Sequence, residues 1–411
     1  MSIETDVKSG EVAAKSITAS DAGAEELSKH TIARARRRRI MIVAGEASGD
    51  LHGGDLAREI LARDPGCELF GIAGEKMRAA GVRAIVEMES IHGLGLSELA
   101  ATIGRTVAAF RELRRVLRRE KPDLLILIDY AEFNLILSGT AKRAGVPVLY
   151  YITPQVWAWR RGRVDKLVER ADRLAVVLPF EAELYHRAGE RVSFVGHPLL
   201  DRVSPPANRA EVLKRHGFSP GTRILALLPG SRRAEVKYLL RPMIEAARVL
   251  ARDHGLEPVI ALAPTLTPSE LEEVGRTKLD GIRIVEGDTY SIVGVSEMAI
   301  VASGTATLET ALLGCPEVIV YKVSALTYVL GRMLITGVDF IGMPNILAGR
   351  KIVPELIQRE VTATNIVRAA ESILSDTIRA ETIKSLKSLR EKLGLPGAAS
   401  RVAWMALGMI E

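Results

Sequence analysis

A turn of small residues, Ser303, Gly304 and Thr305, directly follows an apolar, strand-like run that ends near Val301. The residues after the turn have helical spacing, so the turn stands at a predicted helix N-terminus. The first N–H groups of a helix lack intrahelical partners and carry partial positive charge, which makes this turn a candidate anion site. Glu309, about one turn into the helix, could accept hydrogen bonds from ribose hydroxyls. The alternative is an ordinary strand-to-helix turn with small capping residues.

A second turn of this kind follows the apolar run 224–228 and contains Ser231 and Arg232. The planar guanidinium of Arg232 could contact two phosphates, and the Ser231 hydroxyl could cap the helix that follows. This turn is therefore a second candidate phosphate-binding segment.

Carboxylates stand at two strand ends in the first half of the chain. The apolar run 40–44 leads into a turn with Glu46, Ser48 and Asp50, and the run 124–128 delivers Asp129. Open α/β sheets bind ligands at the carboxyl ends of their strands, where a carboxylate can act as general base, ligand binder or helix cap. The glycine spacing of the first turn is not GxGxxG, which disfavours a dinucleotide site.

An aromatic and basic segment follows a further strand-like run. Trp157 and Trp159 stand directly before Arg160, Arg161 and Arg163, in a chain that is only 4% aromatic. This composition suggests a ligand-facing wall. The alternative is an aromatic core corner with a solvated basic end.

Residues 342–350 are too rich in Gly and Pro for a core helix, and they are expected to form an active-site loop. Asn345 lies in this segment. Its purely structural interpretation is an Asx turn.

The elements that would position these residues alternate between strand-like and helical patterns, which predicts doubly wound βα units. A Ser-Pro-Pro interruption at 204–206 divides them into Rossmann-like domains over 39–203 and 204–375, whose strand ends face across a cleft. Helices over 376–411 would dock on the first domain or on a partner chain. Residues 1–38 are polar and aperiodic, which predicts a disordered extension with a solvated basic end.

The composition excludes several classes of protein. With 411 residues, 47% hydrophobic and 26% charged, the chain suits two or three domains with proper cores. Its two cysteines, Cys67 and Cys315, lack metal-ligand and CxxC spacing, so we expect reduced core thiols, no disulfide and no metal site. There is no apolar run of about 18 residues and no apolar signal core, so we expect a cytoplasmic protein.

The net charge of +6 would suit nucleic acid, an anionic membrane or anionic substrates. Arginines cluster at 34–39 and 111–119 without interleaved aromatic residues. No zinc-finger, helix-turn-helix or RNP-type pattern accompanies them, so we do not expect nucleic-acid binding.

The second arginine cluster lies on a predicted amphipathic helix, 105–120, which follows an apolar segment interrupted by glycines, 91–99. Its apolar stripe is predicted to contain Val107, Phe110, Leu113 and Leu117. Basic faces beside exposed apolar residues suit an anionic membrane surface, and a helix packed on the sheet with a solvated arginine face is the alternative. The candidate membrane contacts are Ile91, Leu94, Leu96, Arg111, Arg114, Arg115 and Arg118.

Seven segments, taken in order, resemble one family: the lipid-A-disaccharide synthases, glycosyltransferases of the two-domain GT-B architecture. The segments lie between residues 41 and 358, so the likeness covers nearly the whole chain beyond the N-terminal extension. They read VAGEASGD, LIDYAEFN, PQVWAWRRGRV, FVGHPL, LLPGSR, SGTATLE and PNILAGR. The resemblance implies an α/β fold of two Rossmann-like domains facing across a cleft.

The resemblance also implies a reaction. A 2,3-diacylglucosamine unit passes from its UDP derivative to 2,3-diacylglucosamine 1-phosphate, with inversion, to give a β-1',6-linked disaccharide and UDP for lipid A biosynthesis. Asp129 matches the family's essential aspartate and would be the base, while Glu132 in the same motif is the other candidate and Asp129 would then only orient substrate.

The remaining roles follow from the same match. Glu46 and Asn345 would contact substrate, and Arg232 would bind UDP together with the helix N-terminus at 303–305. No metal or cofactor is required if arginine and protein dipoles stabilise the leaving diphosphate. The lipid substrates favour the membrane interpretation, at the inner face of the cytoplasmic membrane, and family members suggest a homodimer through the last helices.

Two other classes of function stay open at this point. One is another GT-B enzyme acting on UDP-N-acetylglucosamine, either a muramyl-lipid transferase or a non-hydrolysing 2-epimerase. The other is a basic nucleic-acid-binding protein, which would show a steep salt dependence of binding.

Overall fold

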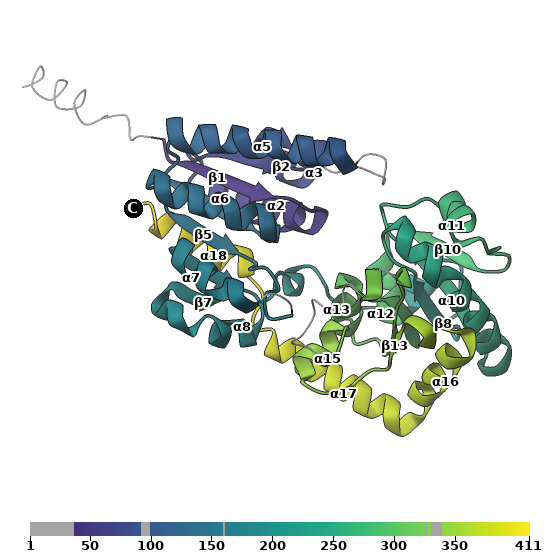
Figure 1. The fold of residues 1–411 in the computed structure, drawn as a ribbon. Helices are drawn as coiled ribbons and strands as arrows, with labels where there is room; N and C mark the ends of the chain where they lie inside the picture. Colours follow the sequence, from purple (N-terminus) through teal and green to yellow (C-terminus); the bar gives the residue numbers. More distant parts are fainter. Residues whose placement is uncertain (1–36, 92–98, 159–160, 326, 330–338) are drawn as a thin grey trace, which may run out of the picture.

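The computed structural model describes residues 37–91, 99–158, 161–325, 327–329 and 339–411. Within these ranges the chain forms two parallel β-sheets in separate halves of the molecule, each with helices on both faces (Figure 1). The predicted extension, residues 1–38, lies almost wholly outside the described residues, as do Leu94 and Leu96.

The first sheet has seven parallel strands in the order β3-β2-β1-β4-β5-β6-β7. The direction of the strand order reverses between β1 and β4, which pair along their length, with Ala44 opposite Ile128. Strand β4 is buried at every position, as an apolar parallel strand covered on both faces must be. The strands are β1 (Arg39–Ala44), β2 (Glu68–Ala73), β3 (Arg83–Glu87), β4 (Leu124–Ile128), β5 (Val148–Tyr151), β6 (Arg173–Val176) and β7 (Val192–Phe194).

The second sheet repeats this order with six parallel strands, β10-β9-β8-β11-β12-β13, and reverses between β8 and β11. The predicted two doubly wound units are therefore confirmed. The strands are β8 (Arg223–Leu228), β9 (Leu256–Leu262), β10 (Arg283–Glu286), β11 (Met298–Ala302), β12 (Glu317–Tyr321) and β13 (Glu355–Ile357).

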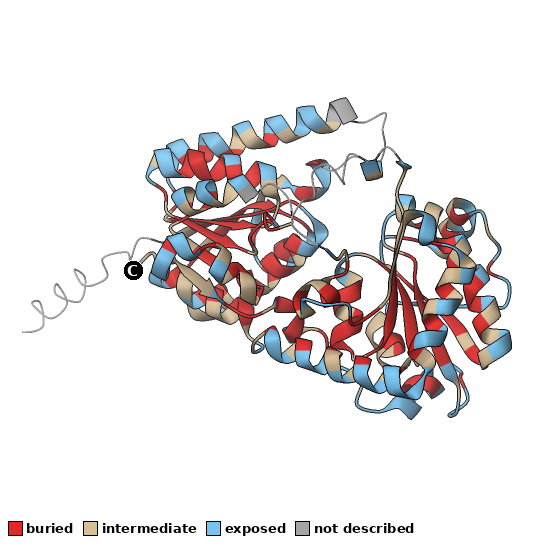
Figure 2. Cartoon of the chain, turned by 60° about the horizontal axis from the view of Figure 1, so that its bottom comes forward, coloured by how far each residue is buried: buried red, intermediate tan, exposed pale blue. Residues whose placement is uncertain are grey.

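Alternate side chains of the first sheet enter two different cores. Figure 2 shows the central strands of both sheets in the colour of buried residues. Ile40 and Ile42 pack with α2 on one face, while Met41 and Val43 pack with α5 and α6 on the other. The helices of this half are α2 (Ala47–Arg63), α3 (Glu75–Ala79), α4 (Met88–Ile91), α5 (Leu99–Arg119), α6 (Ala131–Ala144), α7 (Val164–Arg170) and α8 (Pro179–Leu184).

The second sheet is covered in the same way. One face packs against α10, α11 and α16, and the other against α12 and α13. The helices of this half are α9 (Arg209–Arg215), α10 (Arg233–His254), α11 (Pro268–Gly275), α12 (Thr289–Val295), α13 (Thr305–Leu312), α15 (Met343–Ala348) and α16 (Ala363–Leu374).

The C-terminal segment links the two halves. Helix α17 (Asp376–Lys392) packs beside α13, α15 and α16, and α18 (Ala398–Gly408) packs against α2 in the first half (Figure 1). One hydrophobic cluster consequently runs through both halves and contains Leu56, Leu308, Leu386 and Val402.

Two local predictions need correction. Residues 343–348 form the short helix α15 rather than a loop, with Pro344 in its first turn, where a missing N–H costs nothing. Val107 does not belong to the packed stripe of α5, because its side chain is 41% exposed, whereas Ala109, Leu113, Val116 and Leu117 are buried.

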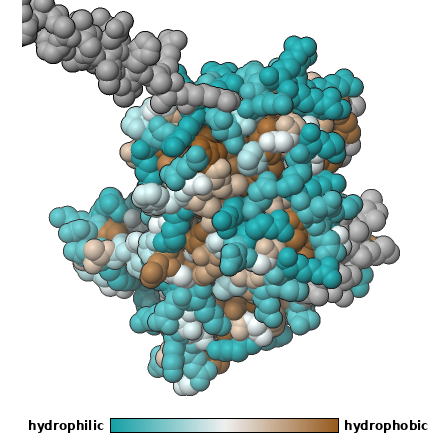
Figure 3. All heavy atoms as spheres, turned by 90° about the vertical axis from the view of Figure 1, so that its left-hand side faces the viewer, coloured by the Kyte–Doolittle hydropathy of each residue, from teal (hydrophilic) through white to brown (hydrophobic). Residues whose placement is uncertain are grey.

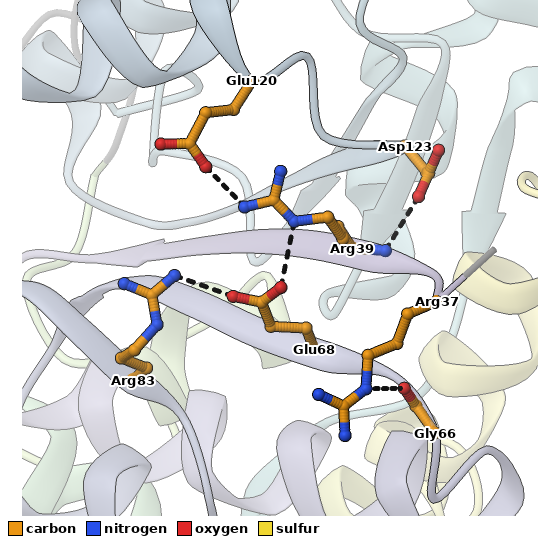
Figure 4. Close-up of polar contacts among 7 residues, drawn as sticks. All are labelled: Arg37, Arg39, Gly66, Glu68, Arg83, Glu120 and Asp123. Carbon is orange, nitrogen blue, oxygen red and sulfur yellow. Dashed lines mark hydrogen bonds and ion pairs between the residues drawn. The ribbon is translucent and has the colours of Figure 1, made fainter.

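The described part of the basic run, residues 37–39, is not a freely solvated charge run (Figure 4). Arg39 forms ion pairs with Glu68 at 3.0 Å and with Glu120 at 2.5 Å, and Arg37 donates to the Gly66 carbonyl at 3.0 Å. Arg83 binds the other oxygen of Glu68 at 2.7 Å. These contacts join the first residues of β1, β2 and β3, at the amino ends of the strands.

The face drawn in Figure 3 is mostly hydrophilic, with hydrophobic residues in small patches. Among the described residues, no helix combines the length and the apolar character needed to cross a bilayer.

Candidate functional site

The two points where the strand order reverses place the candidate residues. Helices that leave neighbouring strands on opposite faces open a crevice at the carboxyl ends of β1 and β4, and likewise at β8 and β11. The turn with Glu46 follows β1 and Asp129 follows β4, while Arg232 follows β8 and Ser303 follows β11. The four sequence motifs thus occupy the four strand ends at which such sheets bind ligands.

A cavity of about 400 Å³ lies between the two halves. Asp129, Glu46 and Ser48 line it from the first half, and the turn 303–305 lines it from the second. With Gln155 and His197 included, the structure therefore brings together residues from five of the seven segments quoted above. The other lining residues include His52, Thr153, Gln155, Glu181, His197, Ile341 and Met343.

Asp129 is held in an unusual backbone conformation. Its φ is 46° and that of Tyr130 is 49°, both left-handed values that cost energy for residues with a Cβ. The Asp129 carbonyl accepts hydrogen bonds from Tyr150 Oη and Asn134 Nδ2, both at 2.8 Å, which fix this conformation. Burial, with a contribution from the negative charge of Glu46, raises the pKa of Asp129 to about 6. Such a carboxylate can take up a proton near neutral pH.

The turn after β1 is close to the turn after β4. A Cβ on Gly45 would lie 2.2 Å from the Tyr130 ring, so only glycine allows this ring to rest on the turn. Glu46 and Ser48 are exposed at the start of α2. Asp50 faces away from the cavity, because its carboxylate accepts from the backbone N–H groups of Gly74, Lys76 and Met77 and thereby caps α3.

Sequence reasoning missed three titratable residues of this cavity. Glu181 is 1% exposed and accepts from Thr153 Oγ1 at 3.2 Å and from Leu178 N at 3.0 Å, and burial raises its pKa to about 7. Burial lowers the pKa of His52 to about 4 and that of His197 to about 3, so both imidazoles are neutral. The signals for His197 were its position directly after a strand-like run and its place in the FVGHPL segment, and the other two residues gave none.

A second cavity, of about 610 Å³, lies in the second half. Its lining includes Arg232, Glu309, Tyr290 and the turn 303–305. Glu309 accepts a hydrogen bond from Tyr290 Oη at 2.7 Å, and burial raises the pKa of its carboxyl.

The hydrogen bonds of the turn before α10 differ from those predicted. Ser231 does not cap the helix; instead its N–H and that of Arg232 both donate to Glu235, at 2.9 and 3.2 Å. A Cβ on Gly230 would lie 2.2 Å from the Glu235 carboxylate. The Arg232 side chain remains 74% exposed and beside the cavity.

The N-terminus of α13 is shared, since residues 303–305 line both cavities. The first N–H groups of this helix can stabilise an anion that lies between the two cavities. The arrangement thus places a candidate carboxylate base on one side and a candidate phosphate-binding region on the other.

Asn345 lies outside both linings. It is fully buried, and its amide binds Val353 O at 2.9 Å, Glu355 Oε1 at 2.7 Å, and the backbone N–H groups of Ile352 and Val353 at 2.7 and 3.0 Å. Glu355 also accepts from the N–H groups of Ile341 and Gly342. In this geometry the Asn345 amide is engaged within the protein, and through Glu355 it supports the cavity wall at Ile341.

The predicted membrane contacts divide into three groups. Ile91 is 2% exposed and packs in the core, so the prediction of a surface contact is wrong for this residue. Leu94 and Leu96 lie outside the described residues. The side chains of Arg111, Arg114, Arg115 and Arg118 are exposed on α5.

Comparison with known proteins gives concordant results. The family model described as lipid-A-disaccharide synthetase matches residues 40–406. A lipid-A-disaccharide synthase of Geobacter metallireducens is 47% identical over 380 residues, which cover 92% of this chain and 98% of that protein.

Solved structures share the architecture at low identity. The UDP-GlcNAc 2-epimerase of Neisseria meningitidis bound to UDP-GlcNAc is similar with a TM-score of 0.62 at 12% identity, covering 90% of this chain and 100% of that one. The glycosyltransferase of kitacinnamycin is similar with a TM-score of 0.60 at 15% identity, covering 92% and 100%. These likenesses establish the GT-B fold alone. Because a family model and a close relative each span most of its length, the chain belongs to the lipid-A-disaccharide synthetase family, glycosyltransferases of lipid A biosynthesis.

Proposed function

We propose that this enzyme transfers 2,3-diacylglucosamine from its UDP derivative to the 6-hydroxyl of 2,3-diacylglucosamine 1-phosphate, with inversion at the transferred carbon. The observation that carries the proposal is the shared N-terminus of α13, which lines both the cavity with Asp129 and the cavity with Arg232. A donor whose diphosphate lay at this helix would have its sugar on the Asp129 side and its uridine on the other.

In the proposed reaction, Asp129 takes the proton of the acceptor hydroxyl while the hydroxyl oxygen bonds to the transferred carbon of the donor sugar. The bond from that carbon to the diphosphate breaks, and UDP carries the electron pair away. The N–H groups at 303–305 and the Arg232 guanidinium stabilise the charge that develops on the diphosphate. Glu309 would bind the ribose, while Glu46 and Ser48 would bind the sugars. Glu132 forms an ion pair with Arg163, which makes it the weaker candidate for the base.

The test measures disaccharide and UDP formation from the acylated donor and acceptor in the presence of EDTA. Product from this pair, and none when unacylated UDP-N-acetylglucosamine replaces the donor, is the expected result. Equal turnover of the unacylated sugar would favour a muramyl-lipid transferase, and interconversion of UDP-sugar epimers without a disaccharide would favour a 2-epimerase.

We also propose that α5 binds the anionic inner face of the cytoplasmic membrane. Ile103 and Val107 are 57% and 41% exposed, and the exposed arginines follow them along one side of the helix at steps of three and four residues. Apolar residues followed by cations suit insertion into an anionic interface.

This surface can be tested with vesicles that contain anionic lipid. Replacing Ile103 and Val107 by Ser should lower the bound fraction, whereas Ile378→Ser, at a 44% exposed position on α17, should not. Equal binding by all three proteins would mean that α5 is not the contact. The homodimer suggested by the family is a separate proposal, to be checked by light scattering.

A further inference from the structure

The cavity beside Asp129 contains an imidazole whose hydrogen-bonding direction is fixed by the backbone. His197 Nδ1 accepts a hydrogen bond from the Leu199 N–H at 3.2 Å. A nitrogen that accepts from an N–H group carries no proton, so the proton of the neutral ring is on Nε2. His197 therefore has an N–H donor at Nε2, and the residue is part of the cavity lining.

The backbone around His197 is held rigidly by the C-terminal segment. The His197 N–H donates to the Leu393 carbonyl at 3.0 Å, and Arg401 Nε donates to the Val195 carbonyl at 2.9 Å. Gly196 has a φ of 77°, and a Cβ there would lie 2.7 Å from the Leu395 carbonyl oxygen. A donor supported in this way keeps one position, which is what recognition of a single substrate atom requires.

A second imidazole lies on the same wall. His52 is 8% exposed, it lines the cavity, and its Nδ1 has no hydrogen-bond partner among the described residues. The ion pair between Asp55 of α2 and Arg202, at 2.6 and 2.8 Å, holds α2 against the segment that follows His197. Buried polar atoms without hydrogen-bond partners are uncommon, so this wall is suited to a ligand that supplies such a partner.

The charges of the lining indicate which part of a ligand it suits. The side chains known to line this cavity include Glu46, Asp129 and Glu181 but neither lysine nor arginine. Carboxylates and neutral imidazoles bind hydroxyl groups and disfavour a phosphate. The wall with these groups therefore suits the hydroxyl groups of a sugar ring better than a phosphate.

We propose that His197 Nε2–H donates a hydrogen bond to the 4-hydroxyl of the acceptor sugar and thereby directs the neighbouring 6-hydroxyl toward Asp129. The inference rests on the proposed function, in which the 2- and 3-positions are acylated and the 1-position is phosphorylated. The 4-hydroxyl is then the one free hydroxyl that does not react. His197 is a substrate-binding residue that sets acceptor specificity.

Two substitutions separate binding from folding. In His197→Asn, the side-chain oxygen replaces Nδ1 as the acceptor for Leu199 N–H, but nothing reaches the position of Nε2. In His197→Gln, the amide nitrogen reaches the position of Nε2, but the Leu199 N–H loses its acceptor. His197→Asn should fold like the wild type but bind the acceptor poorly. His197→Gln should be less stable than the wild type but bind the acceptor well.

The measurement is kcat/KM for the natural acceptor and for its 4-deoxy analogue, with the KM for the UDP-sugar donor recorded beside it. The wild type and His197→Gln should prefer the natural acceptor by about three- to tenfold, the effect of one neutral hydrogen bond. His197→Asn should turn over both acceptors equally, with an unchanged donor KM. A preference by His197→Asn equal to that of the wild type would overturn the inference.

The two proposals fail differently. If the wild type makes no disaccharide from the natural acceptor, the proposed function is wrong. If it makes disaccharide but shows no preference over the 4-deoxy analogue, the proposed function stands and the role of His197 is wrong.

Discussion

Asp129 combines two features that a folded protein normally avoids. Its backbone has a left-handed φ of 46°, and burial disfavours its charged form. The hydrogen bonds to its carbonyl from Tyr150 and Asn134 maintain the conformation, as expected of a strained residue kept for function. A carboxylate that takes a proton from a hydroxyl group benefits from a pKa closer to neutrality. Burial of Asp129 therefore lowers the stability of the fold and favours the proposed chemistry at the same time.

Asp129→Asn should abolish turnover and increase stability at pH 8. The folded pKa is about 6 and the ordinary value is 3.8, so above pH 6 the fold carries an ionised group that it disfavours. Asn removes that charge and tolerates the left-handed conformation. The gain should be on the order of 1–3 kcal/mol at pH 8 and should fade as the pH falls from 6 toward 4. Urea unfolding at both pH values measures it; an equal gain at pH 4 would show that charge is not the cause.

Glu46→Gln tests the second cause of the raised pKa. With the charge of Glu46 removed, the pKa of Asp129 should fall, because a neighbouring negative charge disfavours ionisation. The acidic limb of the kcat/KM profile, expected near pH 6 in the wild type, should move to lower pH. The position of the limb is independent of how much activity the variant loses. An unmoved limb would assign it to another group, with Glu181 the first candidate.

Among the elements, the two strand-to-helix turns of the first half depend on each other. The Tyr130 ring rests on Gly45 and stacks on Phe133 of α6, with the ring centroids 5.0 Å apart. Asp129 directly precedes this ring. Its position therefore depends on a glycine of a different strand end.

Gly45→Ala should lower kcat/KM by at least tenfold while leaving UDP affinity unchanged. The new Cβ would overlap the Tyr130 ring at 2.2 Å, and moving the ring displaces Asp129, whereas the proposed UDP site lies in the other half. Small displacements of a catalytic group can have effects of this size. Gly104→Ala on α5 is the matched control, since nothing lies within 4 Å of its Cβ and alanine favours helix. Steady-state kinetics and calorimetry with UDP measure both; unchanged turnover in Gly45→Ala would show that the ring does not position Asp129.

The same elements explain what could be predicted from the sequence. Apolar runs marked the strands, and strand ends at one edge of a parallel sheet must meet, which brought Asp129, Glu46 and Ser303 into one lining. The sequence did not single out His52 or Glu181, because a polar residue in a helical pattern is predicted to face solvent until the packing is known. The sequence predicts that Asn345 contacts substrate. Its hydrogen-bond partners at 352–355 could not be predicted, because they depend on how α15 lies beside β13 in the fold.

At the scale of the whole molecule, the two halves are joined by more than a linker. The hydrophobic cluster that contains Leu56 and Leu308 is continuous across them. Arg390 of α17 donates to Val203 O at 3.1 Å, between the halves, and to Leu312 O at 3.4 Å, at the last turn of α13. Binding at α13 should therefore stabilise the first half as well.

The tryptophans allow this coupling to be measured. The chain has three: Trp157 lies in the first half, Trp404 lies on α18, which packs against that half, and Trp159 lies outside the described residues. UDP at 100 times its Kd should raise the free energy of unfolding by about 2.7 kcal/mol. Although the proposed UDP site lies in the second half, the urea transition followed by tryptophan fluorescence should shift as far as the one followed by circular dichroism. Arg390→Met should reduce the fluorescence shift. A fluorescence transition that ignores UDP while circular dichroism responds would mean that the halves unfold independently.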